Sequence, residues 1–97
     1  MVESAADRAV VKAGDYLNKL TGEKIERECR ESITRGCREI VVDFTATETV
    51  NSIGISILLG VIDSASTSGA QVTFHGVKQS TAELFEMLGL TRHVTID

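Results

Sequence analysis

Proline and tryptophan are absent from this sequence of 97 residues, and aromatic residues make up only 4% of it. Without proline, the turns depend on glycine, which occurs eight times. Two cysteines are too few for the disulfide framework of a small secreted domain. Hydrophobic residues (42%) and charged residues (25%) occur in ordinary globular proportions, so we expect a single domain over residues 1–97.

Basic residues are in the minority: the sequence has 10 of them and 14 acidic residues, which gives a net charge of -4. A chain of this charge is repelled by phosphate backbones, so we expect no nucleic-acid partner. The longest apolar run, 57–62, contains Gly60 and is far shorter than the roughly 20 residues of a membrane span. Residues 1–13 carry Glu3, Asp7 and Arg8 where a signal peptide is apolar. We therefore expect a cytoplasmic protein without direct membrane insertion.

Groups that could bind a metal or catalyse a reaction are few. On a continuous helix, Cys29 and Cys37 would lie about 12 Å apart, beyond the reach of a disulfide. Together with His75 and His93 they show none of the spacings typical of zinc ligands. No catalytic triad, carboxylate pair or glycine-rich phosphate loop stands out, and Asp43 is interpreted as a loop-capping carboxylate. The sequence therefore indicates no metal, no cofactor and no enzymatic activity.

The first half of the chain is predicted to form three strands and one helix. Residues 10–11 and 16–17 are expected to pair as antiparallel strands across a tight turn. Thr21 is the expected N-cap of a helix that has an apolar residue at every fourth position and ends before Gly36. The β-branched run 40–42 is typical of a central strand covered on both faces.

The second half is predicted to alternate between helices and strands. A helix is expected over 52–67, followed by a strand at 72–74. Ser80 and Glu83 are expected to form the capping box of a third helix, and a last short strand is expected at 94–96.

The predicted order is β-β-α-β-α-β-α-β, which corresponds to an α/β domain with a mixed sheet and helices packed on it. Strands separated by helices run parallel through right-handed crossovers. Loops at the carboxyl ends of such strands are the usual functional rim. The segment 45–56 is the longest loop of this kind that leads into a helix, and it is the candidate functional segment.

A 100° step per residue divides the helix 52–67 into two faces. The expected core face consists of Ile55, Leu58, Leu59, Val61, Ile62 and Ala65. The opposite stripe consists of Ser52, Ser56, Gly60, Asp63 and Thr67, with Ile53 at its border. A stripe of small side chains allows close approach of another protein, but it also fits a plain solvated face, and the pattern does not separate these two interpretations.

Ser52 is open to two interpretations as well. A serine or asparagine at the start of a helix commonly serves as the N-cap, and either Asn51 or Ser52 is placed to do so. A phosphate on Ser52 would also be favoured there by the unpaired N–H groups and the positive end of the helix dipole. Position alone favours the N-cap.

Several motifs in the chain resemble the landmarks of the STAS domain family, which comprises bacterial anti-sigma factor antagonists and cytoplasmic domains of sulphate transporters. In order they are Gly14-Asp15-Tyr16-Leu17-Asn18, Ile40-Val41-Val42-Asp43-Phe44, Val50-Asn51-Ser52-Ile53-Gly54-Ile55 with Leu58-Leu59, Val72-Thr73-Phe74-His75-Gly76-Val77 and Leu88-Gly89-Leu90. The resemblance covers nearly the whole chain. Its most specific part is the Asn-Ser-Ile-Gly element after the apolar strand.

The resemblance implies an anti-sigma factor antagonist that acts by partner switching. Such an antagonist binds an anti-sigma factor that is itself a serine kinase; phosphorylation releases the complex, and a serine phosphatase restores it. Carried onto this chain, the phosphoacceptor is Ser52. The implied partner-binding residues are Thr47, Glu48, Thr49, Asn51, Ser52, Ile53, Ser56, Gly60 and Asp63.

The chain departs from the usual antagonist pattern beside the phosphoacceptor. Asn51 stands where such antagonists commonly have Asp, and Ile53 where they often have a second Ser. The alternative function is therefore a non-phosphorylated scaffold subunit of a transporter or signalling assembly that uses the same surface. The oligomeric state is left open by the sequence.

Overall fold

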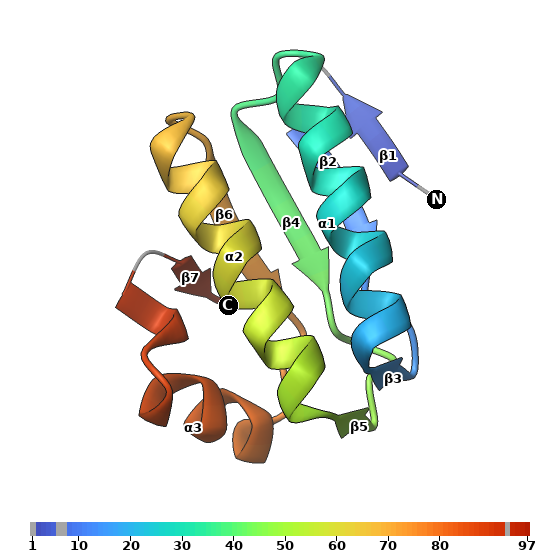
Figure 1. The fold of residues 1–97 in the computed structure, drawn as a ribbon, viewed down its shortest axis with the longest axis vertical. Helices are drawn as coiled ribbons and strands as arrows, with labels where there is room; N and C mark the ends of the chain where they lie inside the picture. The colour runs from blue at the N-terminus through green and yellow to red at the C-terminus, as the bar shows by residue number, and fades with distance from the viewer. Residues whose placement is uncertain (1, 6–7, 93) are drawn as a thin grey trace.

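The computed structural model describes residues 2–5, 8–92 and 94–97. A five-stranded sheet has the order β1-β2-β4-β6-β7, and a separate two-stranded sheet joins β3 and β5 (Figure 1). The strands are β1 (Val2–Ala5), β2 (Arg8–Lys12), β3 (Tyr16–Leu17), β4 (Glu39–Asp43), β5 (Thr49–Val50), β6 (Gln71–His75) and β7 (Val94–Ile96). The helices are α1 (Lys19–Thr34), α2 (Ser52–Thr67) and α3 (Gln79–Met87), followed by a 3-10 turn at Leu90–Arg92.

The main sheet is mixed, as predicted. Strands β2, β4, β6 and β7 run parallel, whereas β1 is antiparallel to β2. Helices α1 and α2 lie side by side on one face of this sheet, and α3 lies below them in the view of Figure 1. The predicted helix over 52–67 is confirmed residue for residue as α2. In the described part of the chain, no helix is long and apolar enough to cross a bilayer.

The core lies between the sheet and the helices. Alternate residues of the central strands, such as Ile40 and Val42, point into it and are fully buried. Phe44, Phe74 and Phe85 form an edge-to-face cluster, with ring centroids 5.1 to 5.6 Å apart. Because Phe85 comes from α3 and the other two rings come from the sheet side, this cluster fixes α3 to the sheet.

The predicted antiparallel pairing of residues 10–11 with 16–17 is wrong. Strand β2 pairs with β1 on one side and β4 on the other, while β3 pairs in parallel with β5. After β2 the chain does not turn back, because the N–H of Ala13 donates to the carbonyl of Asp43 at 2.9 Å and continues the ladder with β4. The segment with Gly14 therefore does not close a hairpin; it contacts the loop before α2, where the hydroxyl of Thr47 donates to the carbonyl of Gly14.

The predicted caps of α1 and α3 need correction. Asn18, not Thr21, is the N-cap of α1, and Thr21 is its capping-box partner three residues on. Helix α3 begins after Lys78 without a side-chain cap bond, so Ser80 and Glu83 form no capping box. The predicted end of α1 is confirmed by Gly36, whose φ of 91° suits the residue after a helix.

The central strand β4 is buried on both faces, as predicted, although in the described part of the chain helices cover only one of them. Within the described residues, the helices lie on one face of the sheet (Figure 1). Val41 points to the other face and is still only 5% exposed. Its register partners Val10 and Thr73 flank it on the neighbouring strands, so the side chains of the sheet itself shield it.

Candidate functional site

The structure shows which residue caps α2 and which is left free for other roles. Asn51 is the N-cap: its Oδ1 accepts a hydrogen bond from the N–H of Ile53 at 2.7 Å. Its own N–H donates to the carbonyl of Leu17 at 2.7 Å, which ties the cap to β3. Ser52 is the first helical residue, and its side chain is exposed. Ser52 is therefore not the N-cap.

The loop that precedes Ser52 is held by the segment around β3. Strands β3 and β5 pair in register, with Tyr16 opposite Thr49. The N–H of Glu48 donates to the carbonyl of Asp15 at 2.8 Å, and the hydroxyl of Thr47 donates to the carbonyl of Gly14 at 2.6 Å. These contacts give the loop a fixed shape at the carboxyl end of the sheet.

Thr47 is the one proposed partner-binding residue whose side chain is buried, with 4% exposure. Its hydroxyl holds the loop to Gly14, so Thr47 shapes the loop through its side chain, and its place in the binding surface stays a prediction. Glu48 and Thr49 are exposed, as the expectation requires. Glu48 also forms an ion pair with Lys78 at the start of α3, which links the loop to that helix.

The exposed face of α2 is a continuation of this loop. Ser56, Gly60 and Asp63 are exposed, and Ile53 leaves 53% of its surface in solvent. The predicted core position of Leu59 is wrong, because 42% of its surface is exposed. On the helical wheel Leu59 lies about 40° beyond Ile55, the edge of the buried face, and therefore within the exposed stripe.

A shallow groove extends the stripe toward the C-terminal part of the chain. Its volume is about 370 Å³ and its lining is Leu59, Gly60, Ile62, Asp63, Gly89 and Leu90. The exposed surface of α2 thus combines two exposed apolar side chains, small residues and one carboxylate. This composition suits contact with another protein, because apolar side chains surrounded by polar groups are typical of such interfaces.

Two glycines determine how closely α1 and α2 approach at the Ser52 end. A Cβ at Gly54 would lie 2.9 Å from the carbonyl oxygen of Leu17 and 3.0 Å from that of Asn18. A Cβ at Gly22 would lie 3.3 Å from the side chain of Ile57. The first turn of α2 is thus packed directly on backbone, which fixes the position of Ser52.

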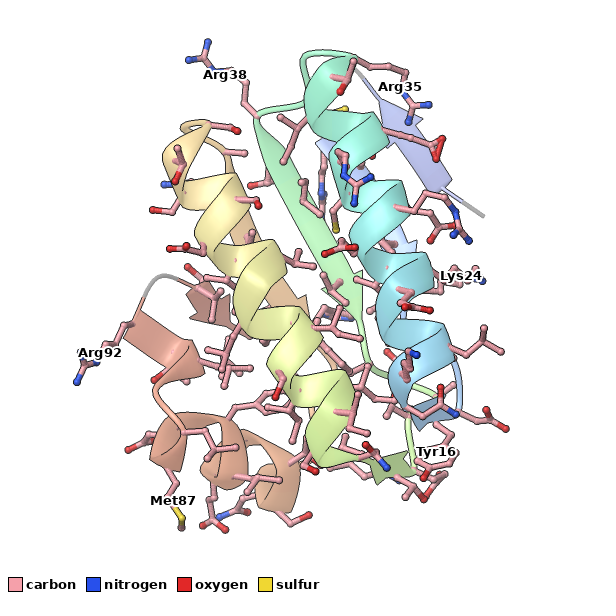
Figure 2. All side chains as sticks on the ribbon, viewed as in Figure 1. Tyr16, Lys24, Arg35, Arg38, Met87 and Arg92 are labelled. Atoms are coloured by element: carbon pink, nitrogen blue, oxygen red, sulfur yellow. The ribbon has the colours of Figure 1, made fainter. Side chains whose placement is uncertain are left out.

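Sequence reasoning missed the contribution of the segment before α1 to this site. Tyr16 is 40% exposed beside Thr49, and Asp15 accepts the N–H groups of the loop through its carbonyl. Both residues belong to one of the family motifs, but only the long-range pairing of β3 with β5 shows that they border the loop before Ser52. Figure 2 shows Tyr16 near the α2 start, at the same end of the molecule.

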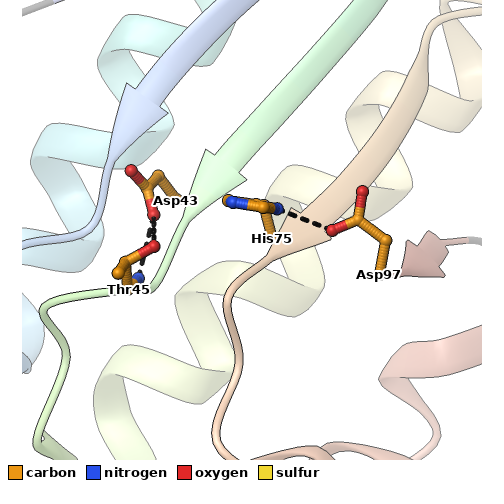
Figure 3. Close-up of polar contacts among 4 residues, drawn as sticks. All are labelled: Asp43, Thr45, His75 and Asp97. Atoms are coloured by element: carbon orange, nitrogen blue, oxygen red, sulfur yellow. Dashed lines mark hydrogen bonds and ion pairs between the residues drawn. The ribbon is translucent and has the colours of Figure 1, made fainter.

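The carboxyl ends of β4 and β6 carry a second polar cluster (Figure 3). Asp43 Oδ1 accepts from both the hydroxyl and the N–H of Thr45, and these hydrogen bonds lower the pKa of the Asp43 carboxyl. This confirms the interpretation of Asp43 as a loop-capping carboxylate. His75 Nδ1 lies 2.7 Å from Asp97 Oδ1, and this hydrogen bond raises the pKa of His75.

Neither cysteine is in a disulfide, and both are buried. Burial, with a smaller effect from the charge of Glu28, raises the pKa of the Cys29 thiol to about 12. Among the residues that the structure describes, no three histidine, cysteine or acidic side chains are grouped so that they could hold a metal ion. His93 lies outside the described residues.

Comparisons with known proteins agree with the fold. The model of the STAS domain family matches residues 3–97. Comparison with curated proteins finds no match. Among solved structures, an RsbS variant from Moorella thermoacetica superposes with a TM-score of 0.83 at 21% identity, covering 100% of this chain and 84% of that one.

Two further structures have similar folds. The phosphorylated form of SpoIIAA, a Bacillus cell fate determinant, gives a TM-score of 0.76 at 16% identity, with coverage of 100% and 89%. The STAS domain of a SulP transporter from Vibrio cholerae gives 0.79 at 17% identity, with coverage of 98% and 77%. The same fold thus occurs in regulators and in a transporter.

Proposed function

The chain belongs to the STAS domain family, and from this premise we propose that it is an anti-sigma factor antagonist that acts by partner switching. In this proposal the unphosphorylated chain binds an anti-sigma factor that is a serine kinase. Phosphorylation of Ser52 breaks the complex, and a serine phosphatase restores it. Solved structures of similar fold include the anti-sigma factor antagonist SpoIIAA in an unphosphorylated form.

The observation that carries this proposal is the exposure of the Ser52 side chain at the start of α2. Asn51 is the N-cap of the helix, so the hydroxyl of Ser52 is not needed for that role. A kinase can therefore reach the hydroxyl without dismantling the helix. The N–H groups and dipole of the first turn also favour a negative group at this place.

The surroundings of Ser52 explain why a phosphate would act as a switch. Exposed Ile53 and Leu59 flank small residues on the same face, so a bound partner would exclude water close to Ser52. A phosphoserine adds about two negative charges, which must then lose their hydration. Phosphorylation is therefore expected to weaken the complex strongly while leaving the free domain folded.

The surface proposed for the partner comprises Thr47, Glu48, Thr49, Asn51, Ser52, Ile53, Ser56, Gly60 and Asp63, together with Leu59 from the groove. The loop part is held in shape by Gly14 and Asp15, and the helical part by the packing at Gly54. A partner would therefore meet a preformed surface, which reduces the entropic cost of binding. An antagonist of this type works in the cytoplasm, where its kinase and phosphatase reside.

The proposal is tested with the purified anti-sigma factor kinase of the same cell and three variants of this chain. Ser52→Ala is expected to bind like the unmodified chain and to resist phosphorylation by ATP. Ser52→Asp is expected to lose at least about tenfold in affinity, equivalent to about 1.4 kcal/mol, at an unchanged melting temperature. Gly60→Arg is expected to block binding sterically, because Gly60 is exposed and a Cβ there meets nothing within 4 Å.

Ser68→Asp is the matched control. It places the same charge at the C-cap of α2, about 24 Å from Ser52 along the helix, and should leave binding unchanged. Equal binding by Ser52→Ala and Ser52→Asp would contradict the switch. If Ser52→Ala and Ser52→Asp both bind, and the kinase phosphorylates neither the unmodified chain nor its variants, the surface serves the alternative role of a constitutive scaffold.

A further inference from the structure

The sheet face opposite the helices carries its charges in a regular pattern. Ala9 and Val11 point into the core, so the alternate residues of β2 point to the other face, and the register extends this alternation across the sheet. The residues on that face are Arg8, Val10 and Lys12 of β2, Glu39, Val41 and Asp43 of β4, and Gln71, Thr73 and His75 of β6. Figure 3 views this face at the carboxyl ends of the strands.

Positive and negative groups on this face lie on adjacent strands. Both basic residues are on β2 and both acidic residues are on β4, at matching register positions. Arg8 Nε lies 3.2 Å from Glu39 Oε1. Lys12 is the register partner of Asp43. Between the two charged rows lie Val10 and Val41, so the centre of the face is apolar and its margins are charged, although Val41 itself leaves only 5% of its surface in solvent.

Within the described residues, no helix covers this face (Figures 1 and 3). From the charge pattern we propose that the face packs against the same face of a second copy, in a two-fold dimer in which β2 of each copy lies over β4 of the other. Such aligned packing of two sheets is a common arrangement in β-sandwiches. The dimer axis then runs between β2 and β4, parallel to the strands.

The charge pattern distinguishes this arrangement from the other face-to-face dimer. With the axis parallel to the strands, Arg8 lies over Glu39 of the second copy, and Lys12 lies over its Asp43. The two valines then meet at the centre. With the axis across the strands, Arg8 would lie over Lys12 of the second copy, and Glu39 would lie over its Asp43. Like charges that face each other disfavour that alternative, so only the first axis gives a complementary contact.

The dimer is expected to be weak and sensitive to salt. With the axis between β2 and β4, the strands that overlap are β1, β2, β4 and β6, because β7 has no counterpart in the second copy. At about 4.8 Å between strands they cover a patch of roughly 19 by 16 Å, or about 300 Å² per copy. This is well under half of the roughly 800 Å² per partner in a standard interface. The opposed charges remain partly solvated at the edges, so we expect 0.5 M NaCl to raise the dissociation constant about tenfold.

This dimer would leave both Ser52 surfaces accessible. Helix α2 lies on the face of the sheet that carries the core, opposite the face proposed to associate (Figure 1). The two Ser52 surfaces would therefore lie on opposite outer sides of the dimer and, because the axis runs parallel to the strands, at the same end of it. A bivalent antagonist of this kind binds a dimeric or clustered partner more tightly than a single copy does, through effective concentration.

The test is sedimentation velocity of the full chain over a range of concentrations, with charge reversals on the two strands. Arg8→Glu and Glu39→Arg are each expected to be monomeric alone, because each places like charges opposite each other across the dimer. Mixed together, they are expected to form a heterodimer, because position 8 of each copy then faces a side chain of opposite charge at position 39 of the other. The double variant Arg8→Glu with Glu39→Arg is expected to regain self-association.

Lys24→Glu and Glu31→Arg are the matched controls, because they make the same charge changes at exposed positions of α1. Both should associate like the unmodified chain, and circular dichroism of every variant checks that it is folded. An unmodified chain that stays monomeric at millimolar concentration and low salt would overturn the proposal. Self-association that Arg8→Glu leaves intact would also overturn it, because the contact would then use another face.

Discussion

Gly54 and Gly60 lie on the same helix but meet different surroundings. A Cβ at Gly54 would press against the backbone of Leu17 and Asn18, whereas a Cβ at Gly60 meets nothing within 4 Å. Gly54→Ala is therefore expected to lower the free energy of unfolding by about 1 to 3 kcal/mol, because the rigid backbone must move. Urea denaturation measures this loss.

Gly60→Ala is the control for that measurement. At an exposed helical position without steric conflict, alanine is expected to raise the free energy of unfolding by up to about 1 kcal/mol. The two variants should thus differ in sign. A Gly54→Ala variant as stable as Gly60→Ala would show that the first turn of α2 is not packed tightly on the segment before α1.

Single residues were predictable where their role depends on near neighbours. The exposure of Ser52, Ile53, Ser56 and Asp63 follows from helical periodicity, and the structure agrees with it. Leu59 was misplaced because the wheel locates the centre of a buried face better than its edge. The burial of Thr47 was not predictable, since its hydroxyl partner is Gly14, 33 positions away in the chain.

At the scale of elements, β6 is joined to the end of β7 by a polar contact in addition to backbone pairing. The hydrogen bond between His75 and Asp97 raises the pKa of His75, with a smaller contribution from the charge of Asp43. A raised pKa means that the contact stabilises the fold below the ordinary histidine value of about 6.5. This stabilisation is lost as the pH rises through the pKa of the folded state.

Replacing Asp97 with asparagine tests this contact. In Asp97→Asn, the pKa of His75 followed by NMR is expected to fall toward its ordinary value, because the carboxylate is gone. The melting temperatures of the unmodified and variant chains should differ more at pH 5.5 than at pH 8.5. An unchanged pKa for His75 would show that the contact with Asp97 does not persist in solution.

The elements themselves were predicted best where one local signal sufficed. The start of α2 was predictable from Asn51 and Ser52, because the residues that favour a helix start lie next to one another in the sequence. Gly69, which follows the helix with a φ of 81°, is a local signal of the same kind at its end. The pairing of β3 was predicted wrongly, since its partner β5 follows only after α1 and β4. A two-residue strand carries no pattern that reveals a distant partner.

At the scale of the whole molecule, the two faces of the sheet differ in what covers them. The helices cover one face and present the Ser52 surface at the start of α2, while the charged second face is free of helices within the described residues. The family and the mixed α/β architecture were predictable from motifs that occur in the right order. The uncovered face was not, because a continuous β-branched strand is equally compatible with a second helical layer.

The measurement that decides the role of this molecule is mass spectrometry of the protein isolated from its native cell. Cleavage after acidic residues releases residues 49–63, in which Ser52 and Ser56 are the only serines. Partner switching predicts that part of this peptide carries one phosphoryl group, which fragmentation places on Ser52, and that Ser56 is unmodified. A peptide that is unmodified under all growth and stress conditions would contradict partner switching.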